Sequence, residues 1–371
     1  MTDLGCIEKV EARTVIIPLA CVARIARRTL RERHYTFVRI YGANGETGIG
    51  FTIGGAPTTT IFRESIAPRL QNQDVAQGEG LWEELYQELL LIGRRGAAIR
   101  ALSAADIAIW DLKAKLIGLT LAQLLGIYRD PVPAYASGGY YIEGSGLREL
   151  EREVASYAES GFDAVKIKVG GLPVAEDVER VRGVRRMLGD DAKLMLDANN
   201  CWPDYQSALR AIRPFEEFDI EWIEEPLSPD DVDGHRRLAE TLDIAVATGE
   251  IEATRWGFLP LIRDRAADVI QADASVVGGI SEWRKIASTA SSFDIPVAPH
   301  WFADLHVHCV ASIPNGIWIE YFTDTSILNV MKLFEQSLRV ERGLAYVPRE
   351  PGLGVALKES EVERYAVDGW A

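Results

Sequence analysis

The sequence predicts an α/β protein: a (β/α)8 barrel of the TIM type, preceded by a smaller α+β unit. Short apolar segments alternate with helical stretches about eight times between residues 133 and 321. Nearly every apolar segment ends in a carboxylate, a lysine or a histidine. Because the C-terminal ends of parallel barrel strands surround one pocket, these polar groups are expected to converge on a single site.

The barrel elements can be placed from the alternating pattern, and we assign them to a domain at residues 129–325. Its strands are predicted to begin near Val132, Ala164, Lys193, Glu221, Ala245, Ala267, Ile295 and Gly316. Its helices are predicted at Leu147–Ser160, Ala175–Leu188, Tyr205–Phe215, Asp233–Leu242, Gly279–Ser292 and Leu305–Ile313. The last helix of the pattern is poorly defined, so we expect the barrel to be modified there.

The N-terminal unit is predicted to span residues 1–128. Strand patterns at Val10–Leu19 and Tyr35–Tyr41 are followed by a helical region that ends near residue 125. In a chain of 371 residues there is room for this unit beside a complete barrel. The tail at residues 326–371 is rich in proline and glycine and is expected to pack back on the N-terminal unit.

Composition excludes several classes of protein. The net charge of −15 argues against binding to nucleic acid, which requires a basic face. No apolar run approaches the ~20 residues that span a bilayer, and residues 1–5 do not begin a signal peptide. The four cysteines form no CxxC pair and are expected to be reduced thiols. A cytoplasmic protein that binds a small molecule is the resulting expectation.

Three carboxylates end neighbouring predicted strands, at Asp197, Glu224 and Glu250. Such a cluster repels itself unless a cation lies within it, and oxygen ligands alone favour Mg²⁺, or Mn²⁺, over zinc. Glu225 follows directly after Glu224 and is expected to point to the opposite side of the strand. The alternative is that the three side chains cap the helices that follow them, which is common for a single Asp or Glu.

Candidate proton-transfer groups lie on other strands of the same pattern. Lys166 and Lys168 alternate with apolar residues and therefore project from one face of a strand. The charge of Lys166 and of a nearby cation is expected to lower the pKa of Lys168, which would let it act as a base. Asp273 and His300 end two later strands, where the carboxylate would orient the imidazole. A solvated pair of lysines and a structural histidine are the alternatives.

These groups together permit removal of the proton next to a carboxylate, because Mg²⁺ stabilises the resulting enediolate. Lys168 or His300 would take the proton. The other group would either return a proton to the opposite face, which gives racemisation, or protonate a β-hydroxyl that leaves as water, which gives dehydration.

A basic segment in the N-terminal unit contains Arg24, Arg27, Arg28 and His34. It can be interpreted as a solvated surface loop or as a flap that meets an anionic substrate. The residues themselves leave both interpretations open.

The motifs in order are KxK at residues 166–168, LDAN at 196–199, IEEP at 223–226, GE at 249–250, QxD followed by GG at 271–279, and PH at 299–300. This ordered set, with the helix at residues 104–113, resembles the mandelate racemase subgroup of the enolase superfamily over nearly the whole chain. Each motif alone is weak, whereas the ordered set is specific.

The resemblance implies a role for each matching position. Asp197, Glu224 and Glu250 would bind one Mg²⁺ per subunit. Lys168 would be the base and Lys166 its neighbour, which also touches the substrate carboxylate. The implied second acid/base pair is Asp273 and His300, and the implied substrate contacts are Asn199, for a hydroxyl, and Glu320, for the carboxylate.

The resemblance also implies that the N-terminal unit is a capping domain whose loops close over the barrel and set specificity. The basic segment and the glycine-rich residues 51–57, beginning at Phe51, would fill that role. A homo-oligomer, commonly an octamer, is a further implication.

Dehydration of an acid sugar, an aldonate or aldarate, to a 2-keto-3-deoxy acid is the function that we favour, and the run at residues 300–308 resembles that of aldarate dehydratases. A racemase or epimerase of a 2-hydroxy acid would use the same residues. A muconate-type cycloisomerase is disfavoured because it usually carries a second lysine where His300 stands. A barrel that only binds a ligand is a further alternative, although it would not need the complete set of groups.

Overall fold

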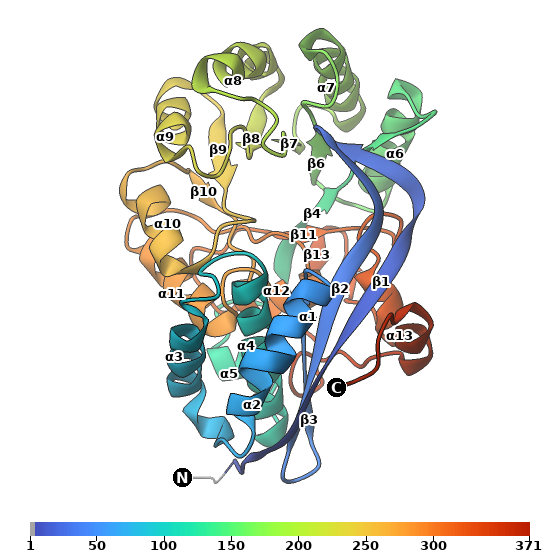
Figure 1. Cartoon of the computed structure of the whole chain (residues 1–371). Coiled ribbons are helices and arrows are strands. Elements are labelled where there is room, and N and C mark those ends of the chain that lie inside the picture. The colour runs from blue at the N-terminus through green and yellow to red at the C-terminus, as the bar shows by residue number, and fades with distance from the viewer. Residues whose placement is uncertain (1–3) are drawn as a thin grey trace.

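The protein is described here from a computed structural model, which covers residues 4–371. Residues 1–3, which are part of the segment judged not to begin a signal peptide, lie outside the described residues. Within residues 4–371, no helix combines the length and the apolar character needed to cross a membrane. Figure 1 shows the N-terminal unit below the barrel, with a long hairpin of two strands that rises beside the barrel strands.

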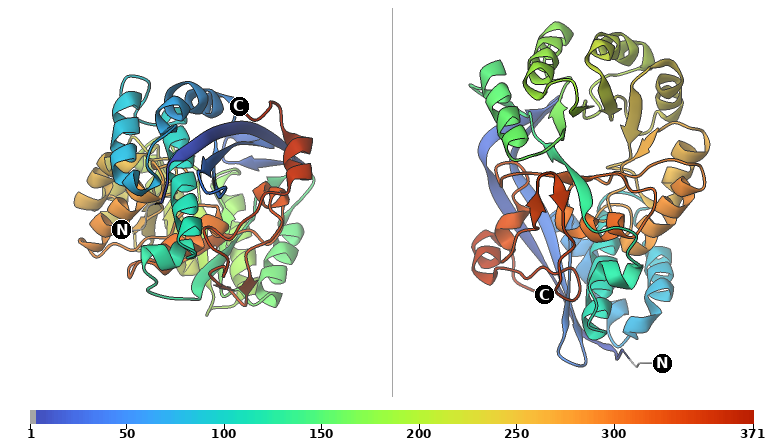
Figure 2. Two further views of the ribbon diagram at one scale, coloured as in Figure 1. Left: turned by 90° about the horizontal axis from the view of Figure 1, so that it is seen from below. Right: turned by 180° about the vertical axis from the view of Figure 1, so that it is seen from behind.

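An antiparallel sheet forms the framework of the N-terminal unit, in the order β3-β2-β1-β5. Its strands are β1 (Ile7–Ile25), β2 (Arg28–Gly42), β3 (Thr47–Ile53) and β5 (Tyr141–Ile142). The last of these belongs to the barrel half of the chain and pairs with Ala23 and Arg24 of β1. This pairing fixes the tip of the hairpin to the barrel, and the right view in Figure 2 shows the tip beside the barrel.

The helices of the N-terminal unit pack on this sheet and on one another. They are α1 (Ala56–Ile61), α2 (Ala67–Leu70), α3 (Gly78–Leu89), α4 (Ala97–Leu116) and α5 (Leu121–Leu125), with a π-helical turn at Phe62–Ile66 and a 3₁₀ turn at Val75–Gln77. The buried helix α4 lies against β3 at two glycines, Gly48 and Gly50. A Cβ atom at Gly50 would lie 1.9 Å from the carbonyl oxygen of Ala104, so only glycine allows this close approach.

The barrel is built from parallel strands in the order β11-β4-β6-β7-β8-β9-β10. They are β4 (Val132–Ser137), β6 (Ala164–Lys168), β7 (Lys193–Asp197), β8 (Ile220–Glu224), β9 (Ala245–Thr248), β10 (Val269–Ile270) and β11 (Ile319–Tyr321). The predicted strand at Ile295 is reduced to single bridges from Val297 to Ile270 and to Gly316. These bridges close the ring, so the predicted barrel is confirmed.

Helices surround the barrel, and all six predicted barrel helices are present. They are α6 (Leu147–Glu159), α7 (Val174–Leu188), α8 (Tyr205–Ile212) with a 3₁₀ turn at Arg213–Phe218, α9 (Val232–Thr241), α11 (Ile280–Ser291) and α12 (Ala303–Ala311). A further helix, α10 (Thr254–Arg263), was not predicted, and Pro260 within it weakens the helical pattern. The first helical element after β11 is a short 3₁₀ turn at Val330–Leu333 in place of a full barrel helix, which is the expected modification of the barrel.

The C-terminal segment contains β12 (Val340–Glu341), β13 (Leu344–Ala345) and α13 (Glu359–Tyr365). Strand β13 pairs with the start of β4. The end of the chain returns to the N-terminal sheet, where Ala366 bridges to Val15 and the amide of Ala12 donates to the carbonyl of Ala371. The C-terminal segment thus contacts both the N-terminal sheet and strand β4 of the barrel.

Candidate active site

Three carboxylates meet at the carboxyl ends of neighbouring barrel strands. Asp197 ends β7, Glu224 ends β8, and Glu250 follows β9 by two residues. One oxygen atom of each lies within 4.8 Å of the others, and all three residues are buried. The predicted metal cluster is therefore confirmed as an arrangement of side chains.

The chemistry of this cluster fits a hard divalent cation. Its ligand atoms are all carboxylate oxygens, which is the donor set that Mg²⁺ and Mn²⁺ prefer. Burial and then the charge of Asp197 raise the pKa of Glu224 to about 8. A bound cation would lower the pKa of Glu224 again, because it stabilises the ionised carboxylate.

Glu225 is the first residue after β8. It has a positive φ of 45° and is fully buried, and neither of its carboxylate oxygens has a hydrogen-bond partner. Burial, and then the charges of Glu250 and Asp197, raise its pKa. The turn after β8 therefore buries Glu225 within reach of the charges of the cluster.

The two lysines of β6 reach the cluster from the strand next to β7. Nζ of Lys166 lies 2.8 Å from a carboxylate oxygen of Glu224 and 3.0 Å from one of Glu320. Lys168 forms a close ion pair with Asp197, and its ammonium lies 5.0 Å from the centre of the Tyr140 ring. Both lysines are buried, which excludes the alternative of a solvated face.

The pKa of Lys168 is raised, although the charge of the neighbouring Lys166 was expected to lower it. Burial is the largest single effect and lowers this pKa, and Lys166 lowers it further, but Asp197, Tyr140 and Glu224 together raise it, so the net pKa lies above the ordinary value. A pKa of Lys168 below its ordinary value therefore requires a further positive charge that competes with Lys168 for the carboxylate of Asp197. A divalent cation within the three carboxylates is a group of that kind.

His300 lies on the other side of the carboxylates from Lys168. Its Nδ1 lies 2.9 Å from the carboxylate of Asp273, and its Nε2 lies 3.5 Å from Glu250. Its ring stacks on that of Trp301 at 4.7 Å between centres. Since an ionised carboxylate only accepts, Nδ1 donates to Asp273 and Nε2 remains for proton transfer.

The two predicted substrate contacts also lie at the site. The side-chain amide of Asn199 donates to Asp197 at 3.3 Å, while its carbonyl oxygen is buried without a partner. Glu320 accepts from Ser137 at 2.6 Å and from the backbone amide of Trp301 at 2.9 Å. Asn199 thus keeps one free acceptor, whereas Glu320 is already held in place.

The basic segment is not a loop. Arg24 lies in β1 and Arg28 and His34 lie in β2, with a short turn at residues 26 and 27. Arg28 is exposed, and His34 is exposed and pairs with Glu32 at 2.8 Å. Cross-strand pairing makes this segment a hairpin of two strands. The sequence did not predict the strands because charged side chains conceal their alternating pattern.

Phe51 is likewise not a loop residue. It lies in β3, is fully buried, and packs against Phe37, Phe302 and Phe334 with ring centres 5.2 to 5.9 Å apart. The glycine-rich turn begins only at Gly54. Phe51 therefore supports the core between the capping unit and the barrel, and its assignment to a specificity loop was wrong.

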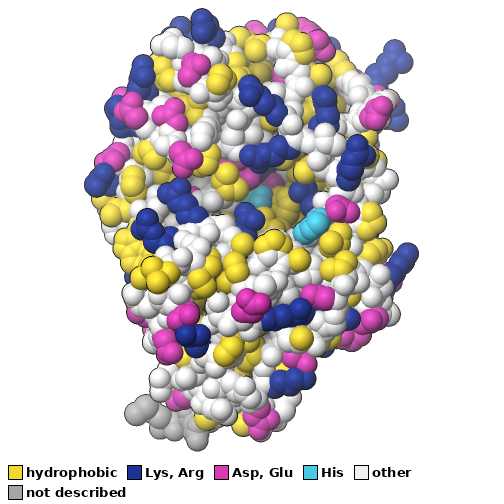
Figure 3. Space-filling model, viewed as in Figure 1, with side chains coloured by type: hydrophobic (Ala, Val, Ile, Leu, Met, Phe, Trp, Pro, Cys, Tyr) yellow, Lys and Arg dark blue, Asp and Glu magenta, His cyan; other side chains and the backbone are white. Residues whose placement is uncertain are grey.

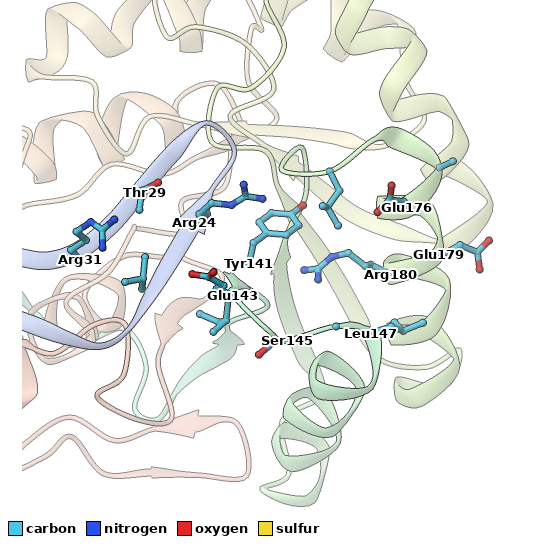
Figure 4. Close-up of a pocket in the computed structure, with 15 residues that line it drawn as sticks. Arg24, Thr29, Arg31, Tyr141, Glu143, Ser145, Leu147, Glu176, Glu179 and Arg180 are labelled. Carbon is cyan, nitrogen blue, oxygen red and sulfur yellow. The ribbon is translucent and has the colours of Figure 1, made fainter.

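A separate cavity of about 910 Å³ lies between the hairpin and helices α6 and α7 (Figure 4). Arg24, Tyr141 and Glu143 line it, and Arg24 donates weakly to the carbonyl of Gly171 at 3.4 Å. Successive residues of an extended segment point to opposite faces, so Tyr140 faces Lys168 while Tyr141 faces this cavity. Arg24 is therefore on the outer side of β5, away from the carboxylates.

Sequence reasoning missed three residues near the site. They are Tyr140, Trp301 and Arg100, of which the last comes from α4 of the N-terminal unit. Figure 3 shows the site as a hollow near the middle of one face, with histidine and acidic side chains inside it and lysine or arginine side chains around it. The one sequence signal that could have identified Tyr140 and Trp301 is their position next to predicted strand ends.

The comparisons with known proteins agree with this architecture. A family model described as "Mandelate racemase / muconate lactonizing enzyme, N-terminal domain" matches residues 9–126. A second, described as "Enolase C-terminal domain-like", matches residues 149–361. The chain belongs to the mandelate racemase subgroup of the enolase superfamily. It is accordingly an enzyme of that subgroup, with a capping domain joined to a modified barrel.

Three relatives illustrate the range of the subgroup. Arabinonate dehydratase of Saccharolobus solfataricus is 37% identical over 333 residues, which are 87% of this chain and 88% of that protein. The structure of L-talarate dehydratase from Polaromonas sp. JS666, complexed with Mg and L-glucarate, has a TM-score of 0.89 at 37% identity and covers 99% of both chains. A racemase from Streptomyces coelicolor with bound magnesium has a TM-score of 0.92 at 33% identity, over 97% of this chain and 100% of that one.

Proposed function

We propose that the protein is a Mg²⁺-dependent dehydratase of an acid sugar, which converts an aldonate or aldarate to a 2-keto-3-deoxy acid. One observation carries the proposal: the carboxylate cluster lies between two proton-transfer groups, with Lys168 paired to Asp197 on one side and His300 next to Glu250 on the other. A substrate carboxylate placed at the cluster would have one group on each side.

Asp197, Glu224 and Glu250 would hold the cation, which supplies positive charge beside the substrate carboxylate and so makes the neighbouring C–H more acidic. Lys168 would remove the proton from C2. Lys166, which Glu224 and Glu320 hold in place, would keep its proton and face the substrate carboxylate. Burial lowers the pKa of Lys166, but Glu224 and Glu320 raise it well above the ordinary value, which suits a group that remains charged.

His300 would then protonate the hydroxyl on C3, which leaves as water. Burial lowers the pKa of His300, while Glu250 and the hydrogen bond to Asp273 raise it, and the net pKa lies above the ordinary value. A raised pKa favours the protonated imidazolium at neutral pH, as a general acid requires. Asp273 would hold the ring so that Nε2 faces the substrate.

Racemisation is the second candidate, because the same two groups on opposite faces could exchange a proton at C2 without loss of water. Its specific support is the likeness to the Streptomyces coelicolor racemase structure. Other relatives of this chain are named as cycloisomerases of acid sugars. The second base in this chain is His300 and not a lysine, which keeps a muconate-type reaction disfavoured.

The test is a product screen. Purified protein with Mg²⁺ is incubated with a panel of aldonates and aldarates, and 2-keto acid is detected with semicarbazide. The proposal predicts a keto acid from at least one substrate, and its loss in EDTA. Solvent deuterium incorporation at C2 with no keto acid from any substrate would favour racemisation instead.

A further inference from the structure

The capping helix α4 packs along the barrel loop that follows β10, and its N-terminal end points towards the active site. The carboxylate of Asp106 accepts from Ser281, and one turn earlier in the helix the hydroxyl of Ser103 accepts from the amide of Gly278. The same loop begins at Asp273, the partner of His300. Continuing one further turn along α4 in this direction reaches Arg100.

The packing of β3 against α4 leads independently to the same position for Arg100. Gly48 lies against Ala108 and Gly50 against Ala104, so the strand and the helix run in opposite directions. Gly54, beyond the end of β3, would then lie near residue 100, and a Cβ atom there would lie 3.7 Å from Cδ of Arg100. Both sets of contacts place Arg100 at the end of the capping unit that faces the carboxyl ends of β9 and β10.

Arg100 has no partner for its guanidinium among residues 4–371. No hydrogen bond or ion pair of its side chain to any described residue occurs, and Nε is buried without an acceptor. The side chain is half-buried, so its terminal amino groups are the part that remains open. The described charges that act on it are those of Asp273 and Glu250, both at the active site, while burial itself lowers its pKa.

An unpaired, half-buried guanidinium is costly for folding alone, since it loses water without gaining an acceptor. Other arginines near the site are held by the fold. Arg33, for example, donates to the carbonyl of Ile327 at 3.2 Å and stacks over Trp301 at 4.4 Å. Arg100 therefore differs in having its planar donor group free for an acceptor that the chain does not supply.

We propose that Arg100 binds the second, distal carboxylate of the substrate, so that the enzyme acts on a diacid sugar in preference to the corresponding monoacid. The inference rests on the proposed function, which places the first carboxylate at the cluster beside Lys166. Strand β6, which carries Lys166, and strand β10, below Arg100, are far apart in the barrel order. An extended chain between them would present its two ends to Lys166 and to Arg100.

A guanidinium and a carboxylate form two parallel hydrogen bonds, whereas the terminal hydroxyl of a monoacid offers no charge and accepts less well. The relatives leave the choice open, because one is named for arabinonate, a monoacid, and another was solved with L-glucarate, a diacid. In this chain Arg100 is positioned to supply the discrimination.

The experiment measures binding separately from turnover. The Lys168→Ala variant, which we expect to bind ligand without turning it over, is loaded with Mg²⁺ and titrated calorimetrically with matched pairs that differ only at C6, galactarate with galactonate and glucarate with gluconate. The same titrations are made with Arg100→Gln added. We expect Arg100→Gln to weaken diacid binding about 10- to 100-fold, as for a charged hydrogen-bonded pair, and monoacid binding less than about threefold.

Two further variants sharpen the result. Arg94→Gln removes the same charge from an exposed arginine in the loop before α4 and should leave both affinities unchanged. Arg100→Lys keeps the charge but loses the planar pair of donors, so its diacid affinity should fall between those of arginine and glutamine. Equal losses for diacid and monoacid, no loss, tighter binding of monoacids before mutation, or no diacid binding would each overturn the inference.

Turnover then separates this inference from the proposed function. If the wild-type protein forms no keto acid from any substrate but Arg100→Gln still weakens diacid binding selectively, dehydration fails and the role of Arg100 stands. If keto acid forms from diacids and Arg100→Gln leaves kcat/KM unchanged, dehydration stands and the role of Arg100 is refuted.

Discussion

Nδ1 of His300 lies 2.9 Å from the carboxylate of Asp273, and this contact leaves Nε2 of the same ring directed towards Glu250, at 3.5 Å. A histidine that ends a barrel segment is thereby fixed in one orientation, with one nitrogen available to a substrate. Lys168 and Asp197 form the corresponding pair on the other side. A lysine paired with Asp197 and a histidine paired with Asp273 thus lie on either side of the carboxylate cluster, which is the arrangement that the proposed acid/base roles require.

Replacing Lys168 by alanine should reduce kcat by about 10² to 10⁴, because the group proposed to take the C2 proton is lost. The loss should appear in kcat and kcat/KM alike, with a far-ultraviolet circular dichroism spectrum like that of the wild type. Lys193→Ala is the matched control, since Lys193 begins the next strand, is exposed and pairs with Glu221. Unchanged kcat in Lys168→Ala would exclude it as the base.

Replacing Glu250 by alanine should remove the stabilisation that Mg²⁺ gives to the wild-type protein. By mass action, Mg²⁺ at about 100 times its Kd stabilises the folded state by ~2.7 kcal/mol, which raises Tm. Differential scanning fluorimetry with Mg²⁺ and with EDTA measures this difference. The exposed Glu217 provides a control, because Glu217→Ala should keep the full Mg²⁺ effect. An equal Tm shift in Glu250→Ala would remove it from the metal site.

Mg²⁺ should bind more tightly as pH rises from 6 to 9. The pKa of Glu224 without metal is raised to about 8, so this carboxyl group retains its proton at neutral pH and must release it to become a ligand. Calorimetric titrations in buffers of different ionisation enthalpy count the protons released. A flat affinity with no proton release would contradict the raised pKa.

The same pKa has a consequence for the metal-free protein. Between the ordinary value of 4.5 and about 8, the folded state binds more protons at Glu224 than the unfolded state does. The contribution of this group to stability therefore falls as pH rises through that window, and Mg²⁺ should restore it. Urea unfolding in EDTA at several pH values, repeated with Glu224→Gln, isolates the effect.

Asp111 is expected to be a strong determinant of stability. Its buried carboxylate accepts from the amides of Ile49 and Leu353 and from Lys115, and so joins β3, α4 and the C-terminal segment. Asp111→Ala leaves these donors unpaired and should lower the free energy of unfolding by about 3 kcal/mol. Urea denaturation measures the change, and a loss below about 1 kcal/mol would show that the three donors find other acceptors.

Much of the site could be predicted because it lies at strand ends. Period-two alternation placed Lys166 and Lys168 on one face, and the ends of β7 and β8 placed Asp197 and Glu224 beside them. These are local patterns combined with one rule about parallel barrels. The expected homo-oligomer and the implied domain boundaries have no comparable pattern in the chain and stay predictions.

The errors have a common origin in contacts between segments far apart in the sequence. Residues 24–34 read as a basic loop, whereas pairing of β1 with β2 and with β5 makes them a hairpin. Phe51 is buried by aromatic residues that follow it by more than 200 positions. Arg100 reaches the site only because α4 docks on the loop after β10. No periodic pattern in the sequence of the N-terminal unit predicts that docking.

The proposed roles are removal of the C2 proton by Lys168 and expulsion of the C3 hydroxyl by His300. The most direct test uses His300→Asn with Mg²⁺ and a substrate from the screen in deuterium oxide. We predict that the variant exchanges the C2 proton with solvent, seen by proton NMR, while keto acid formation falls by at least about 10². Loss of exchange together with loss of product, or normal product formation, would contradict the assignment of the two groups.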